Sequence, residues 1–408
     1  MTGLRRRVTA ICIVAAAVAL PAQASAGWNV AGAGNAYTKA LVMPPAADTP
    51  TVSITGRNVT VSWTQPQLPD GTPVDAHVVR RYDESTGLEQ PIGPGCSGPI
   101  SALTCTEDAV APGNWRYTVA ARHGAWDGSE SSPSATVTVG SPTLAFTPPT
   151  TATSLPATFA GTIDNFLSGS TVTYRLDDPA TGPVLAATTT PSPIPGNGSA
   201  AVSVTIPKGT TNGTHSMYAI GDLGDVASAS IDVNVTPPNP TSLRLRNYAT
   251  AGSPRRTDRI EVTFSQRLDV ASICSTWSGD SSNQSISGDY VAWVIITNNA
   301  APSGNDLLTV QTTSAACGGQ FHFGNIDLGS PNFVTGNVYY GGTGTNQTRV
   351  SWNATNFRMD ITLGAIAMGP APGTVGGSVT ATYTPDSLIT NPSGTPITGT
   401  ASRTAVQF

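Results

Sequence analysis

Apolar side chains alternate with small polar ones in short runs along most of the chain. Between Thr51 and Gly140 the alternation includes Val59, Val61 and Trp63. A period of two is what a half-buried strand requires, because successive side chains point to opposite faces of a sheet. Gly, Pro and Asp residues separate the runs and predict turns. The spacing predicts about seven short strands in this segment, as in a β-sandwich.

The same alternation continues towards the C-terminal residue and predicts two further β segments. Strands are expected at 171–176, 201–206, 215–220, 229–235, 260–264, 292–296, 307–310, 359–363 and 379–383. The Pro-rich run 236–240 predicts a stiff linker between the two segments. The last segment, 241–408, is longer than a plain sandwich of about 100 residues. It is either one elaborated sandwich or two fused ones, and we favour the first. The prediction is an all-β fold of tandem β-sandwiches.

Composition supports this fold class and removes one class of partner. The 408 residues include 42 Gly and 33 Pro, and only 11% are charged, against roughly 25% in an average soluble protein. Such a composition suits short strands joined by many turns, and the length allows several domains. The net charge is −5. Nucleic acid is not expected as a partner, because phosphate binding needs clustered Lys and Arg beyond the leader.

The N-terminal residues have the pattern of an export signal. Arg5–Arg7 form a positive region, an apolar run follows at 11–20, and Ala24-Ser25-Ala26 is a cleavage site of the A-x-A type. We predict a signal peptide over 1–26 and a flexible leader over 27–48. The apolar run is too short for a spanning helix, although a retained membrane anchor is the rival interpretation. The mature chain is expected to be secreted, extracellular or associated with the cell wall, without a membrane span.

Four cysteines remain after cleavage and allow three pairings. Cys96 and Cys105 lie in the first β segment, whereas Cys274 and Cys317 lie in the last. We predict one disulfide within each segment, since disulfides persist outside the cytoplasm. The rival interpretation is a metal site, which needs a C-x-x-C motif or histidines at ligand spacing. The sequence has neither, so neither a metal nor a cofactor is expected.

Three motifs follow one another in residues 49–140, namely VSWTQP, HVVRRYD and APGNWRYTVAARHGAWDGSESSPSATVTV. Together they resemble a fibronectin type III domain. By that resemblance Trp63 is the core tryptophan of strand B, and Tyr117 is the tyrosine of strand F that anchors the E–F corner. The family is a spacer and binding scaffold without chemistry of its own, and the resemblance implies the same role here.

The two later β segments carry motifs of a second kind. The segment 141–235 contains IPKGTTNGTHSMYAIGD and ASASIDVNV, which resemble bacterial Ig-like repeats. In 241–408, the run IEVTFSQRLD resembles the opening of bacterial Ig-like domains of surface proteins, and 386–402 resembles their final strands. The whole layout resembles exported actinobacterial proteins. That likeness implies an architecture and an extracellular location, and it names no ligand.

Catalytic motifs are missing from the sequence, which has neither G-x-S-x-G nor H-E-x-x-H. The four histidines lie far apart in the chain. His77 is expected at the surface or edge of a sandwich, and His322, between Phe321 and Phe323, is expected in a core. Turn aspartates such as Asp222 are expected to be solvated, with calcium binding as the alternative. We therefore expect that the protein is not an enzyme.

Exposed aromatic side chains are the best candidates for contact with a ligand. Trp126 lies in a predicted loop of the first β segment, and Tyr339 and Tyr340 precede Gly341 and Gly342 in a predicted Gly-rich loop. Aromatic side chains on loops present rigid contact area at a low cost in conformational entropy. The alternative for each is that it folds back on its own sandwich.

These patterns favour a non-catalytic, secreted or cell-surface-associated structural or adhesive protein. Its expected partners are cell-wall or extracellular polysaccharides, or surface proteins. One alternative is a carbohydrate-binding accessory protein in extracellular polysaccharide processing, and another is an enzyme with its site in 241–408. Self-assembly through sheet edges is a further hypothesis.

Overall fold

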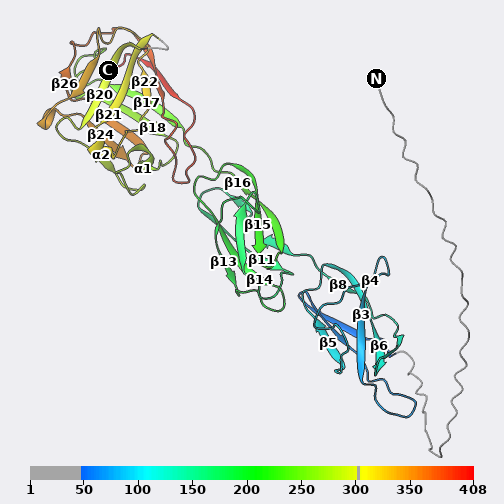
Figure 1. The fold of residues 1–408 in the computed structure, drawn as a ribbon. Coiled ribbons are helices and arrows are strands. Elements are labelled where there is room, and N and C mark those ends of the chain that lie inside the picture. Colours follow the sequence, from blue (N-terminus) through cyan, green and yellow to red (C-terminus); the bar gives the residue numbers. More distant parts are fainter. Residues whose placement is uncertain (1–46, 301–303) are drawn as a thin grey trace, which may run out of the picture. The chain divides into compact units, whose positions relative to one another are not determined.

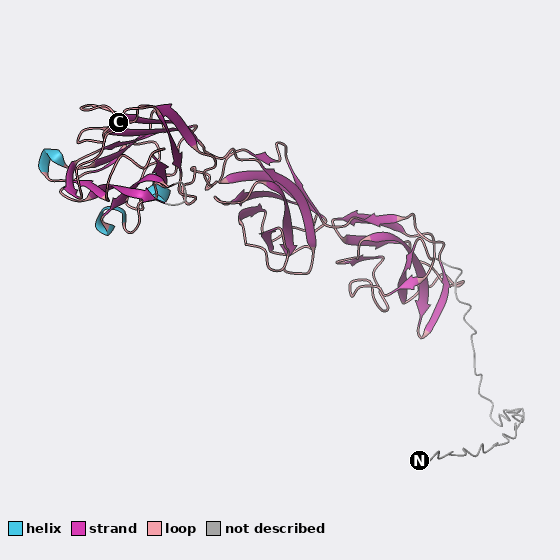
Figure 2. Cartoon of the chain, turned by 90° about the horizontal axis from the view of Figure 1, so that it is seen from above, coloured by secondary structure: helices cyan, strands magenta, loops and turns pink. Residues whose placement is uncertain are grey.

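The chain is all-β throughout the part that the structure describes. The computed structural model describes residues 47–300 and 304–408 (Figure 1), so the predicted signal peptide and most of the predicted leader lie outside the described residues. Strands account for nearly all of the regular structure there (Figure 2), beside three short helical turns. These turns are α1 (Val270–Ile273), α2 (Ser314–Cys317) and the 3-10 turn η1 (Gly344–Asn346).

The first sandwich closes two antiparallel sheets over one core. The three-stranded sheet consists of β1 (Thr51–Thr55), β2 (Asn58–Ser62) and β5 (Thr104–Glu107). The facing sheet consists of β3 (Ala76–Asp83), β4 (Glu89–Gln90), β6 (Gly113–His123), β7 (Trp126–Glu130) and β8 (Val137–Val139). Trp63 and Tyr117 both lie in its hydrophobic core.

The second sandwich has two four-stranded sheets around a core of its own. One sheet contains β10 (Thr151–Ala152), β12 (Val172–Leu176), β15 (Gly213–Gly221) and β16 (Val226–Val233). The other contains β9 (Thr143–Phe146), β11 (Ala157–Asp164), β13 (Ala186–Thr190) and β14 (Ala200–Ile206). Phe159, Phe166 and Tyr174 are among the aromatic residues that fill this core.

The third sandwich is larger and carries the candidate site. Its five-stranded sheet contains β17 (Pro240–Arg246), β18 (Arg259–Phe264), β25 (Arg358–Thr362), β24 (Arg349–Asn353) and β19 (Gln284–Ile286), in that order. Its seven-stranded sheet contains β26 (Ala365–Met368), β23 (Val338–Gly341), β20 (Ala292–Ala300), β21 (Asn305–Thr312), β22 (Asn325–Asp327), β27 (Val379–Thr384) and β28 (Ala401–Ala405). Pro240, expected in the linker, opens β17.

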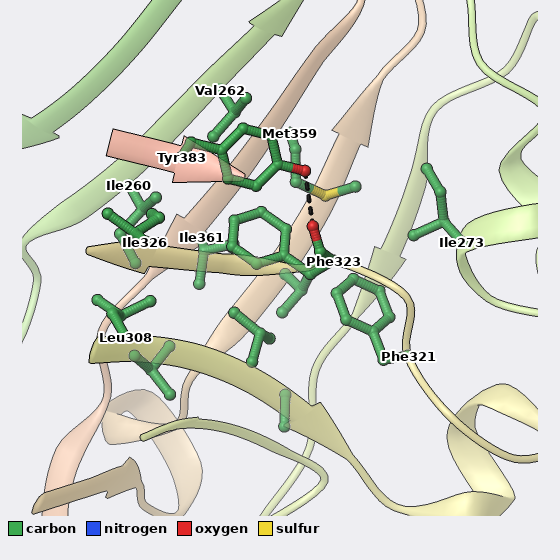
Figure 3. Close-up of a cluster of buried hydrophobic side chains, with 14 of the residues drawn as sticks. Ile260, Val262, Ile273, Leu308, Phe321, Phe323, Ile326, Met359, Ile361 and Tyr383 are labelled. Atoms are coloured by element: carbon green, nitrogen blue, oxygen red, sulfur yellow. Dashed lines mark hydrogen bonds between the residues drawn. The ribbon is translucent and has the colours of Figure 1, made fainter. Parts of the chain in front are cut away.

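A single hydrophobic core joins both sheets of the third sandwich. Ile260 and Ile361 from the five-stranded sheet pack in the same cluster as Leu308 and Ile326 from the seven-stranded sheet (Figure 3). At its centre the Tyr383 hydroxyl donates a 2.6 Å hydrogen bond to the carbonyl oxygen of Phe323. One continuous core means that the segment 241–408 forms one elaborated sandwich within the described residues.

Each disulfide lies inside one sandwich. Cys96 and Cys105 are bonded in the first, with Cα atoms 5.3 Å apart, and Cys274 and Cys317 are bonded in the third, with Cα atoms 4.8 Å apart. The second bond ties the residue that follows α1 to the last residue of α2. Both loops that carry these helices are therefore fixed to each other covalently.

One expectation about the first sandwich was wrong. His77 is completely buried rather than at a surface or an edge, because its ring packs 5.3 Å from that of Trp63, and this burial lowers its pKa. The resemblance to fibronectin type III implied that Tyr117 anchors the E–F corner. Its hydroxyl donates to Glu107 Oε2 at 2.8 Å, at the end of β5 before the turn into β6, and Arg81 donates to Glu107 Oε1 at 2.6 Å.

The single core of the third sandwich leads to a stability prediction. Leu308→Ala should lower the free energy of unfolding of this sandwich by about 2–5 kcal/mol, because a cavity replaces a fully buried side chain. Leu307→Ala, at the adjacent position on the other face of β21, should lower the free energy of unfolding by less than half as much. Denaturant titration measures both losses. Hydrogen exchange should show weaker protection in β18 as well as in β21 for Leu308→Ala; unchanged protection of β18 would contradict a shared core.

Candidate aromatic and polar site on the seven-stranded sheet

The outer face of the seven-stranded sheet is the surface on which the candidate site is built. In β20, Val294 and Ile296 are fully buried in the core, whereas Trp293, which points to the opposite face, is partly exposed. Cross-strand pairing places Tyr339 of β23 and Thr309 of β21 directly opposite Ile295. Since side chains alternate between faces, Trp293, Ile295, Thr309 and Tyr339 share the outer face.

Two aromatic rings form a ledge at one end of this face. The rings of Tyr290 and Trp293, here called the aromatic ledge, are stacked with centroids 5.3 Å apart and planes 22° apart. The indole N–H of Trp293 donates a 3.0 Å hydrogen bond to the carbonyl oxygen of Tyr290. Tyr290 is 45% exposed. The ledge is thus held in one orientation and still presents an aromatic surface to water.

The backbone under the ledge is strained at one position. Tyr290 has a φ angle of +56°, which is uncommon for a residue with a bulky side chain. Two hydrogen bonds hold this loop in place. The Tyr290 N–H donates to the backbone oxygen of Gly342 (3.0 Å), and the Gly344 N–H donates to the side-chain oxygen Oδ1 of Asp289 (2.6 Å). Strained backbone of this kind persists where the surrounding structure over-determines it, and it clusters at functional sites.

The ledge also depends on a missing side chain in β23. A Cβ atom at Gly341 would lie 2.8 Å from the Trp293 ring, closer than real Cβ contacts allow. Glycine at this position therefore lets the indole lie directly against the sheet. This is a close approach that any other residue would prevent.

A polar groove of about 530 Å³ opens beside the ledge. The two are adjacent because Gln311, which lines the groove, is the direct cross-strand partner of Trp293. The volume lies within the range of small-molecule sites. The described residues that line the groove are Leu307, Thr309, Val310, Gln311, Thr312, Gln320, Phe321, Gly324, Asn325, Pro385 and Asp386.

Asp386 is the single ionisable residue in the described lining of the groove. Burial alone would raise the pKa of its carboxyl, but hydrogen bonds from the Leu388 N–H and from His322 outweigh burial, so that the pKa lies below its ordinary value of 3.8. His322 Nδ1 lies 2.8 Å from Asp386 Oδ2. Hydrolysis by two carboxylates needs a second one across the groove. The described lining does not offer it.

The predicted ligand contacts have different environments in the structure. Tyr339 lies on the outer face of the sheet and is partly exposed, next to the ledge. The expectation for Tyr340 was wrong: it belongs to β23 rather than to a loop, it is fully buried, and its hydroxyl donates to Pro254 O at 2.9 Å. Burial raises its pKa. Tyr340 therefore has no access to a ligand.

Trp126 forms a second exposed aromatic position, in the first sandwich. It is 75% exposed and opens β7, immediately after a two-residue turn, where it pairs with His123. Gly124 in the turn has a φ angle of +58° and donates its N–H to Asp75 Oδ2 at 2.8 Å. The turn fixes the backbone, so the indole projects from a rigid hairpin rather than from the loop that we expected.

Two residues of the candidate site were not found by sequence reasoning. Tyr290 and Trp293 were overlooked, since Trp293 reads as part of an apolar strand and Tyr290 as part of a Gly-containing turn. In residues 47–300 and 304–408, no three His, Cys, Asp or Glu side chains gather in a way that could hold a metal ion. Neither does any helix in these ranges have the length and apolar character needed to cross a membrane.

Comparisons with known proteins add little to this description. No family model matches the chain, and no curated protein matches it. Among solved structures, the FN1–FN3 domains of chicken CNTN1 are 9% identical, with 79% of this chain and 100% of that chain covered and a TM-score of 0.23. An I-band fragment of titin is 10% identical, with coverages of 90% and 99% and a TM-score of 0.25. The chain is placed in the class of tandem β-sandwich proteins by its own sheets, described above.

The Asp386 carboxylate leads to a prediction about pH. Because its pKa is lowered, the ionised form of Asp386 stabilises the fold, and this stabilisation is complete above the ordinary value of 3.8. It is lost as the pH falls through the lower pKa of the folded state. The melting temperature of Asp386→Asn should lie below that of the wild-type chain at pH 6. The difference should shrink as the pH falls below 3.8. A gap that stays constant from pH 6 to pH 2 would contradict this assignment.

Proposed function

We propose that the protein is a non-catalytic, exported structural or adhesive protein. Its β-sandwich modules act as spacers that carry exposed aromatic contact positions to a cell wall or to surface proteins. The observation that carries this proposal is the pairing of a pre-oriented, exposed aromatic ledge with a groove whose described lining has one ionisable group. Such a surface offers contact area and hydrogen bonds, but not the acid and base that hydrolysis requires.

Location outside the cytoplasm is part of the proposal. Two features support it, namely the export pattern in residues 1–26 and the two disulfides. Disulfides form and persist in oxidising compartments, and structural ones are rare in the cytosol. The proposed partners, cell-wall or extracellular polysaccharides or surface proteins, belong to the same compartment.

A carbohydrate-binding accessory protein in extracellular polysaccharide processing is the second candidate function. One observation favours it: amide and hydroxyl side chains, rather than charged ones, supply most of the polar lining of the groove. Both candidates are non-catalytic. They differ in role: the first is a spacer and adhesive contact, whereas the second assists extracellular polysaccharide processing.

Retention on isolated cell walls tests the contact function. The full chain should be retained, and Trp126→Ala should weaken retention by roughly fivefold or more, because exposed tryptophans are frequent energetic centres of interfaces. Leu88→Ala is the matched control, since Leu88 is 63% exposed in the same sandwich. Sedimentation of the walls with bound protein measures the effect.

Two outcomes would count against the proposal in different ways. If the full chain binds neither cell walls, nor purified wall polysaccharides, nor surface proteins, it has no adhesive role. If Trp126→Ala and Leu88→Ala both leave retention unchanged, Trp126 does not belong to the contact surface.

A further inference from the structure

We infer that the groove and the aromatic ledge of the third sandwich bind a neutral polysaccharide chain, an inference that rests on the proposed contact function and names its ligand. The polar lining supplies the first argument. The side-chain amides of Gln311, Gln320 and Asn325 make no hydrogen bond to the described part of the chain. Amides and hydroxyls both donate and accept, as sugar hydroxyl groups require.

Charge decides between classes of polymer. The described lining of the groove contains neither Lys nor Arg, and its one ionisable residue, Asp386, is a carboxylate held by His322. An anionic polymer would meet like charge without a compensating cation, which is unfavourable at close range. A neutral chain meets no such penalty.

The ledge supplies the apolar half of the recognition. The face of an aromatic ring carries partial negative charge, and the C–H groups on the face of a sugar ring are polarised in the opposite sense. Tyr290 and Trp293 are already oriented by their stacking and by the indole hydrogen bond. Little conformational entropy is lost on binding, which is how a preorganised site gains affinity. Gln311 is the cross-strand partner of Trp293, so the ledge and the groove adjoin at this pair.

The extent of the site favours a polymer over a single sugar. Asn325 in β22, Thr309 and Gln311 in β21, and Trp293 in β20 lie on three neighbouring strands. Two strand spacings separate the first from the last, or about 10 Å. This distance is longer than one pyranose ring, so adjacent sugars of one chain would occupy the groove and the ledge.

Affinity electrophoresis of the full chain tests this inference. The probes are a soluble galactomannan, a hydroxyethyl cellulose and a glycol chitin, with hyaluronan as the polyanion and a proline-rich peptide as the rival ligand. At least one neutral polymer should retard the chain. Tyr290→Ala and Gln311→Ala should each weaken that retardation by roughly tenfold, as expected for a central contact.

Two further variants separate a binding role from a structural one. Tyr248→Ala is the control, because Tyr248 is 56% exposed in the same sandwich but lies outside the groove, and it should bind as the wild type does. Gly341→Ala keeps every residue of the proposed site but displaces the Trp293 ring, so it should weaken retardation while far-ultraviolet circular dichroism stays unchanged.

The results can overturn the inference without touching the proposed function. Three outcomes would overturn it. None of the three neutral polymers retards the chain, or only hyaluronan or the peptide does. Alternatively, a neutral polymer retards the wild type, Tyr290→Ala and Gln311→Ala equally. If the same chain is still retained on cell walls through Trp126, the adhesive function stands and only its ligand at the groove is wrong. If wall retention is also absent, both fail.

Discussion

The alternation of side chains between the two faces of the seven-stranded sheet is the constraint on which the site depends. Val294 and Ile296 must face the core, and this requirement leaves Trp293 and Tyr339 in contact with water. A shift of one residue in register would exchange the two faces. The energy of the core therefore holds the outer face in place, and the outer residues can serve binding without contributing much to the fold.

The loops around the ledge show how this constraint extends beyond the strands. Tyr290 can keep a positive φ angle because its N–H is bonded to Gly342 and its ring rests on Trp293. Trp293 in turn lies against Gly341, a residue of the next strand. Three elements thus share one arrangement, so the cost of the strained residue is offset by contacts that only the folded sheet provides.

The sequence predicted many of the strands, but it missed others such as β11 and could not assign the two faces of β20. Isolated alternating runs such as 260–264 and 379–383 match β18 and β27. The run 292–296, however, is apolar at every position, so a period of two could not tell which residues face out. Tyr340 was misplaced because Gly341 and Gly342 suggested a loop, whereas a glycine in a strand can also admit a neighbouring ring.

The scarcity of charge in the chain bears on the kind of contact that its surfaces can make. Only 11% of the residues are charged. Two carboxylates at surface hollows are hydrogen-bonded, Glu130 with Tyr82 and Thr118, and Asp386 with His322. Salt screens interactions between exposed charges over about 10 Å or less, but it has little effect on aromatic contacts or on hydrogen bonds between neutral groups. A contact surface made of rings, amides and hydroxyls therefore keeps its affinity when the ionic strength varies, which a surface of ion pairs would not.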